Sequence, residues 1–262
     1  MGSTLRQDQL KLDGIVDRAW RIFSDAEGRI ASLVRPSIPI AWFGDLDAYL
    51  RSPLRVISVG LNPSRLEFPD HDRFERFPRA RDLDGGAARA SEHAAYVSAL
   101  NDYFRERPYT AWFRPSFEDL LQGMGSSFFG SEESTALHTD LFSPLATDPT
   151  WSKLGSEREI LRASGVELWH DLVRLLAPDV ILASVARKYL DEVAFETQGS
   201  WIVIATVERK SPYQVEVRKL RVVAERQTAL VYGRAAQKPF GTISRPDKRN
   251  IGKTVLEHVR AG

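Results

Sequence analysis

The sequence predicts an α/β fold, a three-layer α/β/α sandwich around a central, mainly parallel sheet of four strands. Three observations support this prediction. Four short runs of β-branched and apolar residues are spread along the chain, segments with helical spacing lie between them, and two alternating segments suit a β-hairpin added to the sheet. The four expected strands begin at Arg55, Thr135, Asp179 and Thr228.

The composition is that of an ordinary globular protein. The chain has 262 residues, of which 43% are hydrophobic and 27% are charged. We expect a single domain over residues 1–262, with a helical N-terminal extension over residues 1–50 and a hairpin insertion over residues 200–223. The net charge is +1, so binding to nucleic acid would need a local basic face.

The residues that the sequence lacks exclude several classes of protein. There is no cysteine, which excludes disulfides, thiolate metal sites and a cysteine nucleophile, and we expect neither a metal nor a cofactor. Residues 1–11 are polar, and no apolar run approaches the length of a membrane span. We therefore expect a cytoplasmic monomer that does not enter a membrane.

The first half of the chain is expected to contain two helices, separated by the first strand and a long loop. Helical spacing of apolar residues occurs over residues 9–25 and again over residues 91–106. The loop over residues 64–90 contains three phenylalanines, which a solvated loop would not normally hold. We therefore expect an ordered loop with at least one aromatic ring facing a pocket. The packing face of the first helix is expected to comprise Leu10, Ile15, Ala19, Trp20 and Phe23.

The second half is expected to alternate between strands and helices. A long helix over residues 157–176 should be interrupted near Ser164 and Gly165, and a shorter helix should follow the third strand. Alternating apolar and charged residues predict a hairpin with arms at 201–207 and 213–223. A final helix is expected over residues 251–259.

The first strand ends in a turn that places a polar side chain at a functional edge. Val56, Ile57 and Val59 suit a buried strand, and the strand is followed by Asn62 and Pro63. Ligands of open α/β sheets bind at the carboxyl ends of the strands. An ordinary asparagine–proline turn is the alternative interpretation of the same residues.

Two motifs together resemble the uracil-DNA glycosylase superfamily. Gly60 to Ser64, Gly-Leu-Asn-Pro-Ser, resembles its first motif, which is Gly-x-Asn-Pro-Gly in some branches. Arg114 to Leu120, Arg-Pro-Ser-Phe-Glu-Asp-Leu, is similar to the Pro-Pro-Ser-Leu-x-Asn-Ile segment of the main uracil-excising branch, whose serine contacts a DNA phosphate. Ser116 also suits the N-cap of a helix, a natural phosphate site. The resemblance covers most of the chain from about Arg55 onward, and the expected hairpin lies outside it.

Further positions take their expected roles from this resemblance. Phe77 falls where the family keeps a phenylalanine that stacks on a flipped base, and Asp140 falls where it keeps a base-reading asparagine. The basic loop over residues 234–248 takes the place of the second motif, which enters the minor groove. That motif usually contains histidine, whereas residues 232–250 contain none. Arg234, Gln237 or Ser244 would have to replace it as the donor to the departing base.

The residues suggest how such an enzyme would work. Extracting a base from the stack costs a few kcal/mol. Stacking on Phe77 and insertion of Phe240 into the vacated gap would offset that cost, with phosphate contacts from Lys238, Arg245 and Lys248. A carboxamide is not basic, so Asn62 would orient the attacking water, and charge stabilisation and positioning would supply most of the rate.

Asp140 gives a hypothesis about the excised base. An ionised carboxylate only accepts hydrogen bonds, which suits the amino group of cytosine better than uracil. His138 lies two residues earlier on the same side of the strand and is assigned to the base-binding set, although it could instead pair with Asp140. In the main uracil branch a tyrosine blocks substituents at C5, and here the small Ser64 takes that position. The pocket should therefore accept cytosine modified at C5.

The sequence thus predicts a monofunctional DNA glycosylase that excises a flipped pyrimidine and leaves an abasic site. The expected base is a hydroxymethylated or glucosylated cytosine such as occurs in phage DNA, which would make the enzyme an anti-phage defence. One alternative is a repair glycosylase for uracil or another deaminated base, and another is a nucleic-acid-binding protein without turnover. A small-molecule enzyme is disfavoured because the sequence contains no dinucleotide-binding fingerprint, P-loop or nucleophile elbow.

Overall fold

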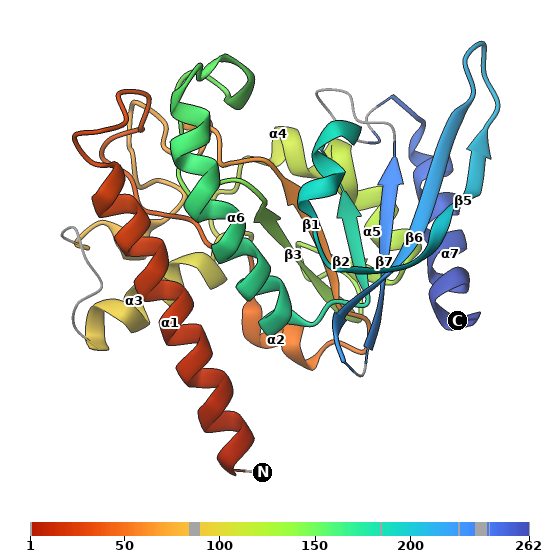
Figure 1. Ribbon diagram of the computed structural model, residues 1–262, viewed down its shortest axis with the longest axis horizontal. Helices are drawn as coiled ribbons and strands as arrows, with labels where there is room; N and C mark the ends of the chain where they lie inside the picture. Colours follow the sequence, from red (N-terminus) through yellow and green to blue (C-terminus); the bar gives the residue numbers. More distant parts are fainter. Residues whose placement is uncertain are drawn as a thin grey trace. The chain divides into compact units, whose positions relative to one another are not determined.

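The computed structural model describes residues 2–83, 90–183, 185–224, 226–233, 240 and 242–261. The chain folds into two compact units (Figure 1). The helical unit comprises residues 1–45, 61–108 and 139–175, and the sheet unit comprises residues 46–60, 109–138 and 176–262. In the described part of the chain, no helix is both long and apolar enough to cross a membrane. That the whole chain forms one domain stays a prediction.

A seven-stranded sheet dominates the sheet unit. The strand order is β2-β3-β1-β4-β7-β6-β5. The pairs β2–β3, β1–β4 and β4–β7 are parallel, whereas β7–β6 and β6–β5 are antiparallel. Every residue of β1 and β4 is buried, as is typical of the apolar central strands of a parallel sheet. The strands are β1 Val56–Gly60, β2 Ser126–Ser127, β3 Ser134–Asp140, β4 Val180–Ala183, β5 Glu196–Val207, β6 Tyr213–Val223 and β7 Arg226–Gly233.

The predicted α/β class is confirmed, but the sheet has seven strands rather than four. All four expected strands form and are neighbours in the order β3-β1-β4-β7. The expected hairpin forms as β5 and β6, and β6 pairs with β7 from Val215 to Val223, so the hairpin extends the sheet. The alternating pattern of β6 predicted a strand but gave no information about the edge with which it would pair.

Helices α5 and α7 approach each other closely in the sheet unit. A Cβ atom at Gly252 of α7 would overlap the carbonyl oxygen of Leu120, and one at Gly123 would overlap that of Arg249. The final helix begins at Arg245, before the expected start at residue 251, and the helix expected after the third strand is a 3-10 segment. The helical segments are α2 Leu46–Arg51, α4 Thr110–Phe113, a π-helical turn Arg114–Glu118, α5 Asp119–Gly123, a 3-10 segment Arg187–Glu192 and α7 Arg245–Ala261.

Three long helices form the helical unit. Helix α1, Gly2–Ala26, buries the expected face except for Leu10, whose side chain is 64% exposed. Helix α3 spans Ala90–Asn101. Helix α6, Glu157–Leu176, is continuous, so the predicted interruption is wrong. Gly165 instead lets α6 approach the backbone of Phe142, where any Cβ atom would overlap the carbonyl oxygen. The shorter 3-10 segments are Arg65–Glu67, Pro78–Ala80 and Trp151–Lys153.

Candidate active site

The segments that follow β1 and β3 run side by side in the helical unit. The amide of Phe142 donates to the carbonyl of Leu61 at 2.9 Å, and the amide of Thr147 donates to the carbonyl of Pro63 at 3.4 Å. Ser64 and Thr147 form an isolated β-bridge. These contacts hold the turn after the first strand against the segment after Asp140, so residues far apart in the sequence form one site.

The side-chain amide of Asn62 is held in a single orientation. Its Nδ2 donates to the carbonyls of Pro63 and Leu145 at 3.0 and 3.2 Å and to Thr147 Oγ1 at 2.9 Å. The only hydroxyl proton of Thr147 is donated to the carbonyl of Pro149, so Thr147 can only accept from Asn62. All three partners are therefore acceptors, which places the amide nitrogen, and not the oxygen, against them.

The opposite side of that amide is available to an outside donor. Among the described residues no hydrogen bond reaches Asn62 Oδ1, and the side chain is half-buried. The oxygen is thus an acceptor in a fixed position. This geometry suits the orientation of a water molecule and does not require the amide to act as a base.

A buried carboxyl group, Glu67, lies five residues after Asn62. It is the last residue of the 3-10 segment that Ser64 caps, since the amide of Leu66 donates to Ser64 Oγ at 3.2 Å. The hydroxyl of Tyr103 donates to Glu67 Oε2 at 2.5 Å. Burial raises the pKa of Glu67 to about 7, the Tyr103 bond and Arg76 oppose that rise, and the negative charge of Asp140 adds to it. Glu67 therefore exchanges its proton near neutral pH.

Asp140 ends β3 and is buried. Its charge acts on Glu67, so the two carboxyl groups belong to the same local cluster of the helical unit. The preceding residue is fixed by α6, because the indole nitrogen of Trp169 donates to Thr139 Oγ1 at 3.0 Å. Glu67 and Tyr103 were not predicted as site residues from the sequence, where the only signal for Glu67 is an acid close to the asparagine motif.

The structure corrects the expected role of Phe77. The ring is fully buried and stacks on Phe68 and Tyr103, with centroid distances of 5.5 and 5.2 Å. The loop is ordered over its described residues, but these rings pack on one another instead of facing a pocket. Because both stacking partners belong to the protein, Phe77 cannot stack on a base in this conformation.

His138 is also a packing residue in this conformation. In the sheet unit, its Nδ1 lies 2.7 Å from Ser58 Oγ, and its ring contacts those of Trp112 and Phe113 at centroid distances of 5.0 and 5.2 Å. The side chain is buried beside these partners. This arrangement supports the strand, and the expected role of His138 in binding a base stays a prediction. Ser64 is half-buried, and its expected role in admitting C5 substituents stays a prediction.

Two of the residues expected to contact DNA, Ser116 and Phe240, are fully buried. Ser116 lies inside the π-helical turn, where it is fully buried, so it is not an N-cap and does not present its hydroxyl to phosphate. Phe240 is fully buried and packs near Phe117 and Tyr213, which excludes an exposed wedge in this conformation. Both corrections arise from packing against residues distant in the sequence.

The structure describes only some of the residues of the last loop that were expected to contact DNA. Arg234, Gln237 and Lys238 lie outside the described residues. Lys248 is 4% exposed and donates to the carbonyl of Pro115, and its burial lowers its pKa, so a direct phosphate contact is ruled out in this conformation.

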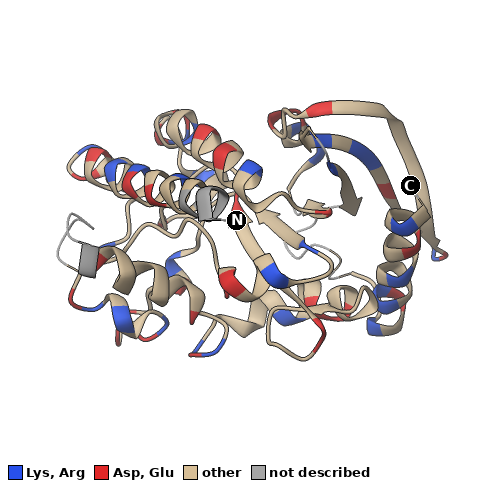
Figure 2. Cartoon of the chain, turned by 90° about the horizontal axis from the view of Figure 1, so that it is seen from below, with Lys and Arg blue, Asp and Glu red and all other residues tan. Residues whose placement is uncertain are grey.

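Ser244 and Arg245, which were also expected to contact DNA, lie at the start of α7. Ser244 accepts from the amide of Asp247 at 3.2 Å and caps the helix. Arg245 pairs with Asp119 at 2.9 Å, yet its side chain is 76% exposed and remains accessible to a phosphate. Helix α7 has five Lys or Arg and two Asp or Glu residues, and Figure 2 shows both signs along the helix that ends at the C-terminus.

The site described here is made of carboxyl, amide and phenol groups. Within the described ranges there is no group of three or more His, Asp or Glu side chains able to hold a metal ion. Comparison of the sequence with protein-family models finds no matching family, and comparison with curated proteins finds no matching relative.

Proposed function

We propose that this chain is a monofunctional DNA glycosylase that removes a flipped pyrimidine and leaves an abasic site. The proposed base is cytosine modified at C5, such as hydroxymethylated or glucosylated cytosine of phage DNA. The proposal includes membership of the uracil-DNA glycosylase superfamily, a three-layer α/β/α arrangement, and a cytoplasmic monomer acting in anti-phage defence. The observation that carries it is the fixed amide of Asn62 with its free acceptor oxygen.

Asn62 supports hydrolysis by positioning water. Oδ1 accepts a hydrogen bond from the water molecule and so aims the water oxygen at C1′ of the sugar. The C1′–N bond breaks, its electron pair leaves with the base, and the water oxygen bonds to C1′. One water proton is then lost and the departing base gains one, so the products are an abasic sugar and a neutral base. The three acceptors around Nδ2 keep the amide from rotating during this step.

Asp140 and Glu67 support the assignment of a cytosine-type base. A carboxyl oxygen of Asp140 accepts from the exocyclic amino group, whereas uracil presents an oxygen at that position. Glu67 holds a proton for part of the time near pH 7 because its pKa is about 7. An acceptor oxygen of Asp140 and the proton that Glu67 holds for part of the time offer an acceptor and a donor, which matches the amino group and N3 of cytosine.

A direct assay tests the proposal. Single- and double-stranded oligonucleotides bearing uracil, cytosine, hydroxymethylcytosine or glucosylated hydroxymethylcytosine are incubated with the protein and then cleaved with alkali at abasic sites. We expect cleavage at a modified cytosine with the native chain and none with Asn62→Ala. Release of uracil alone would support a repair glycosylase instead. Failure with every base on both strand forms would overturn the glycosylase assignment.

A second function, nucleic-acid binding without turnover, is favoured by one specific observation. Phe77 and Phe240, the two rings expected to stack on a base and to fill its gap, are both fully buried. A protein that never flips a base needs neither ring exposed. This function predicts that Asn62→Ala changes neither the affinity for oligonucleotides nor any product.

A further inference from the structure

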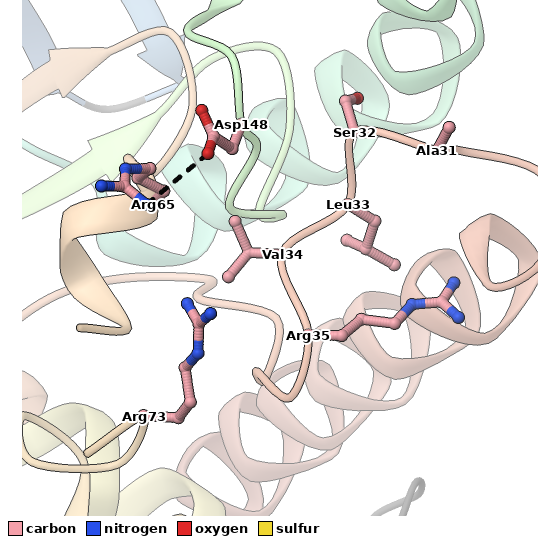
Figure 3. Close-up of a pocket in the computed structure, with 8 residues that line it drawn as sticks. All are labelled: Ala31, Ser32, Leu33, Val34, Arg35, Arg65, Arg73 and Asp148. Carbon is pink, nitrogen blue, oxygen red and sulfur yellow. Dashed lines mark ion pairs between the residues drawn. The ribbon is translucent and has the colours of Figure 1, made fainter. Parts of the chain in front are cut away.

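A pocket of about 210 Å³ lies in the helical unit close to the support of Asn62. Thr147, which accepts from the Asn62 amide, forms bridges with Leu33 and Ser64, and the next residue is Asp148. Leu33 and Asp148 line the pocket, so its wall is continuous with the backbone that orients Asn62. The lining residues are Ala31, Ser32, Leu33, Val34, Arg35, Arg65, Arg73 and Asp148 (Figure 3).

Two arginines of this pocket share one carboxylate. Arg73 Nη2 lies 2.6 Å from Asp70 Oδ1, and Arg65 Nη1 lies 3.4 Å from Asp70 Oδ2. Arg65 also lies 3.6 Å from Asp148. Figure 3 shows the guanidinium of Arg73 directed into the pocket toward Val34, whereas Arg35 extends away from Arg65 and Arg73. An anionic oxygen pair therefore already sits between the guanidinium groups of Arg65 and Arg73.

The three ion pairs differ in how firmly they are held. Arg73 is 28% exposed, and its Nη1 donates to the carbonyl of Phe68 at 2.7 Å, which fixes the guanidinium whatever anion it meets. Asp70 is 65% exposed and Arg65 is 45% exposed. Exposed ion pairs contribute little to stability, so exchange of Asp70 for an external anion costs little. Guanidinium forks bind phosphate oxygens in pairs, which makes a phosphate the preferred replacement.

We propose that Arg65 and Arg73 form a phosphate subsite, and that a backbone phosphate of the bound nucleic acid displaces the carboxylate of Asp70. Asp70 occupies the subsite when nucleic acid is absent and competes with the phosphate. The identity of the ligand as nucleic acid rests on the proposed function. The position beside Thr147 makes it the phosphate that anchors the strand close to the nucleotide at Asn62.

This arrangement predicts effects of opposite sign for residues that contact each other. Arg73→Gln and Arg65→Gln remove a cation and should weaken binding of an oligonucleotide. Asp70→Asn removes the competing anion and should strengthen it, although it breaks the same ion pairs. If these ion pairs were only structural, each of the three substitutions would lower stability and weaken binding of the oligonucleotide.

Fluorescence anisotropy with a labelled oligothymidylate, which offers no base for excision, tests the proposal across a salt series. We expect Arg73→Gln to weaken binding about fivefold and Asp70→Asn to tighten it by about twofold to fivefold. Each arginine substitution should also lower the slope of log affinity against log salt by about 1. Glu159→Gln and Arg162→Gln, which break an exposed arginine–carboxylate pair of α6 at 3.2 Å, serve as matched controls and should change neither quantity.

Each outcome of this experiment decides the subsite. The subsite is overturned if Asp70→Asn and its control Glu159→Gln have equal effects on binding, or if Asp70→Asn binds the oligonucleotide more weakly. It is also overturned if the native chain binds neither the oligonucleotide nor phosphate. Inorganic phosphate at constant ionic strength should compete with the oligonucleotide for the native chain but not for Arg73→Gln. If instead free phosphate binds and the oligonucleotide does not, the subsite serves a small phosphate ligand and the nucleic-acid assignment fails.

The test separates the subsite from the proposed glycosylase. Opposite effects of the two substitutions in a chain that releases no base would leave the subsite standing and sink the enzymatic activity. Base release together with unchanged binding in every variant would overturn the subsite and leave the enzymatic activity standing. Thermal unfolding of each variant shows whether the protein is folded. Arg65→Gln, which breaks ion pairs with the exposed carboxylates of Asp70 and Asp148, remains informative if Arg73→Gln unfolds.

Discussion

Two buried glutamates in this molecule have contrasting surroundings. Glu118, in the sheet unit, accepts from Ser127 Oγ at 2.6 Å, from the amide of Phe128 at 3.4 Å and from Gln122 Nε2 at 3.5 Å. Burial raises the pKa of Glu118, and all three bonds oppose that rise. Glu67, in the helical unit, has the Tyr103 hydroxyl, and the charge of Asp140 raises its pKa further.

The difference separates a structural carboxylate from a titrating one. Three donors surround Glu118, so its charge is compensated and its surroundings require an acceptor. Glu67 is buried with the Tyr103 hydroxyl as its donor and feels the charge of Asp140, and its pKa of about 7 leaves the proton free to exchange at neutral pH. Strongly shifted acids in pairs are typical of functional sites. We therefore assign Glu67 to the candidate site and Glu118 to the fold.

The largest expected effect concerns Asn62, which lies in the same turn as Glu67. Asn62→Ala removes the fixed acceptor for water and should lower the rate of base release about a hundredfold or more. Measurement of single-turnover rates by alkaline cleavage checks this. Ser116→Ala, in the π-helical turn that also contains Glu118, is the control and should leave the rate unchanged. A larger loss of rate in Ser116→Ala than in Asn62→Ala would show that the active site does not lie at Asn62.

Substitution of the two glutamates by glutamine should affect stability in opposite directions. The folded pKa of Glu67 is raised, so the stability that its proton supplies is complete below about pH 4.5 and is lost as pH rises through about 7. Glu67→Gln should therefore be more stable than the native chain at pH 8, by up to about 3 kcal/mol, and similar to it at pH 4.5. Denaturant unfolding at the two pH values measures this difference.

Glu118→Gln should lower stability, in contrast to Glu67→Gln. The amide keeps one acceptor for three donors and turns an NH₂ group toward one of them, so we expect a loss of about 1–2 kcal/mol. If Glu67→Gln is destabilised at pH 8 as much as Glu118→Gln, Glu67 is a structural residue and the contrast between the two sites is wrong.

A smaller effect is expected on the choice of base. Asp140→Asn replaces an acceptor by a group that donates and accepts, which suits uracil. The ratio of modified cytosine release to uracil release should fall about tenfold or more. Competition between the two oligonucleotides in one reaction measures the ratio directly. An unchanged ratio would show that Asp140 does not contact the base.

The sequence predicted elements well where a local pattern decides the structure. Val56, Ile57 and Val59 specify a buried strand by their side chains alone, and the alternation in β6 specifies another. The pairing of β6 with β7 depends on the free edge of a sheet that no local pattern records. The attachment of the hairpin to this edge of the sheet could therefore not be predicted from the sequence.

The candidate site was predicted only in part for a similar reason. Asn62 was found because its motif and its place after a strand are local features. Ser116 had the sequence of an N-cap, but α4 runs directly into its π-helical turn and leaves no helix end there to cap. The burial of Phe240 and of Glu67 depends on residues tens of positions away in the sequence. Such contacts decide both the exposure of a ring and the pKa of an acid.

The smallest expected effect tests the surroundings of Glu67 most directly. The hydrogen bond from Tyr103 lowers the pKa of Glu67, so Tyr103→Phe should raise that pKa, whereas Asp140→Asn removes a negative charge and should lower it. Carbon NMR of the labelled Glu67 carboxyl group across a pH titration measures both changes without any substrate. Phe104→Leu, which alters a ring packed against Tyr103 at 5.0 Å, controls for loosened packing. Shifts of the same sign in the Tyr103 and Asp140 variants would mean that burial alone sets the pKa, and the proposed pairing of Glu67 with Asp140 would then lose its basis.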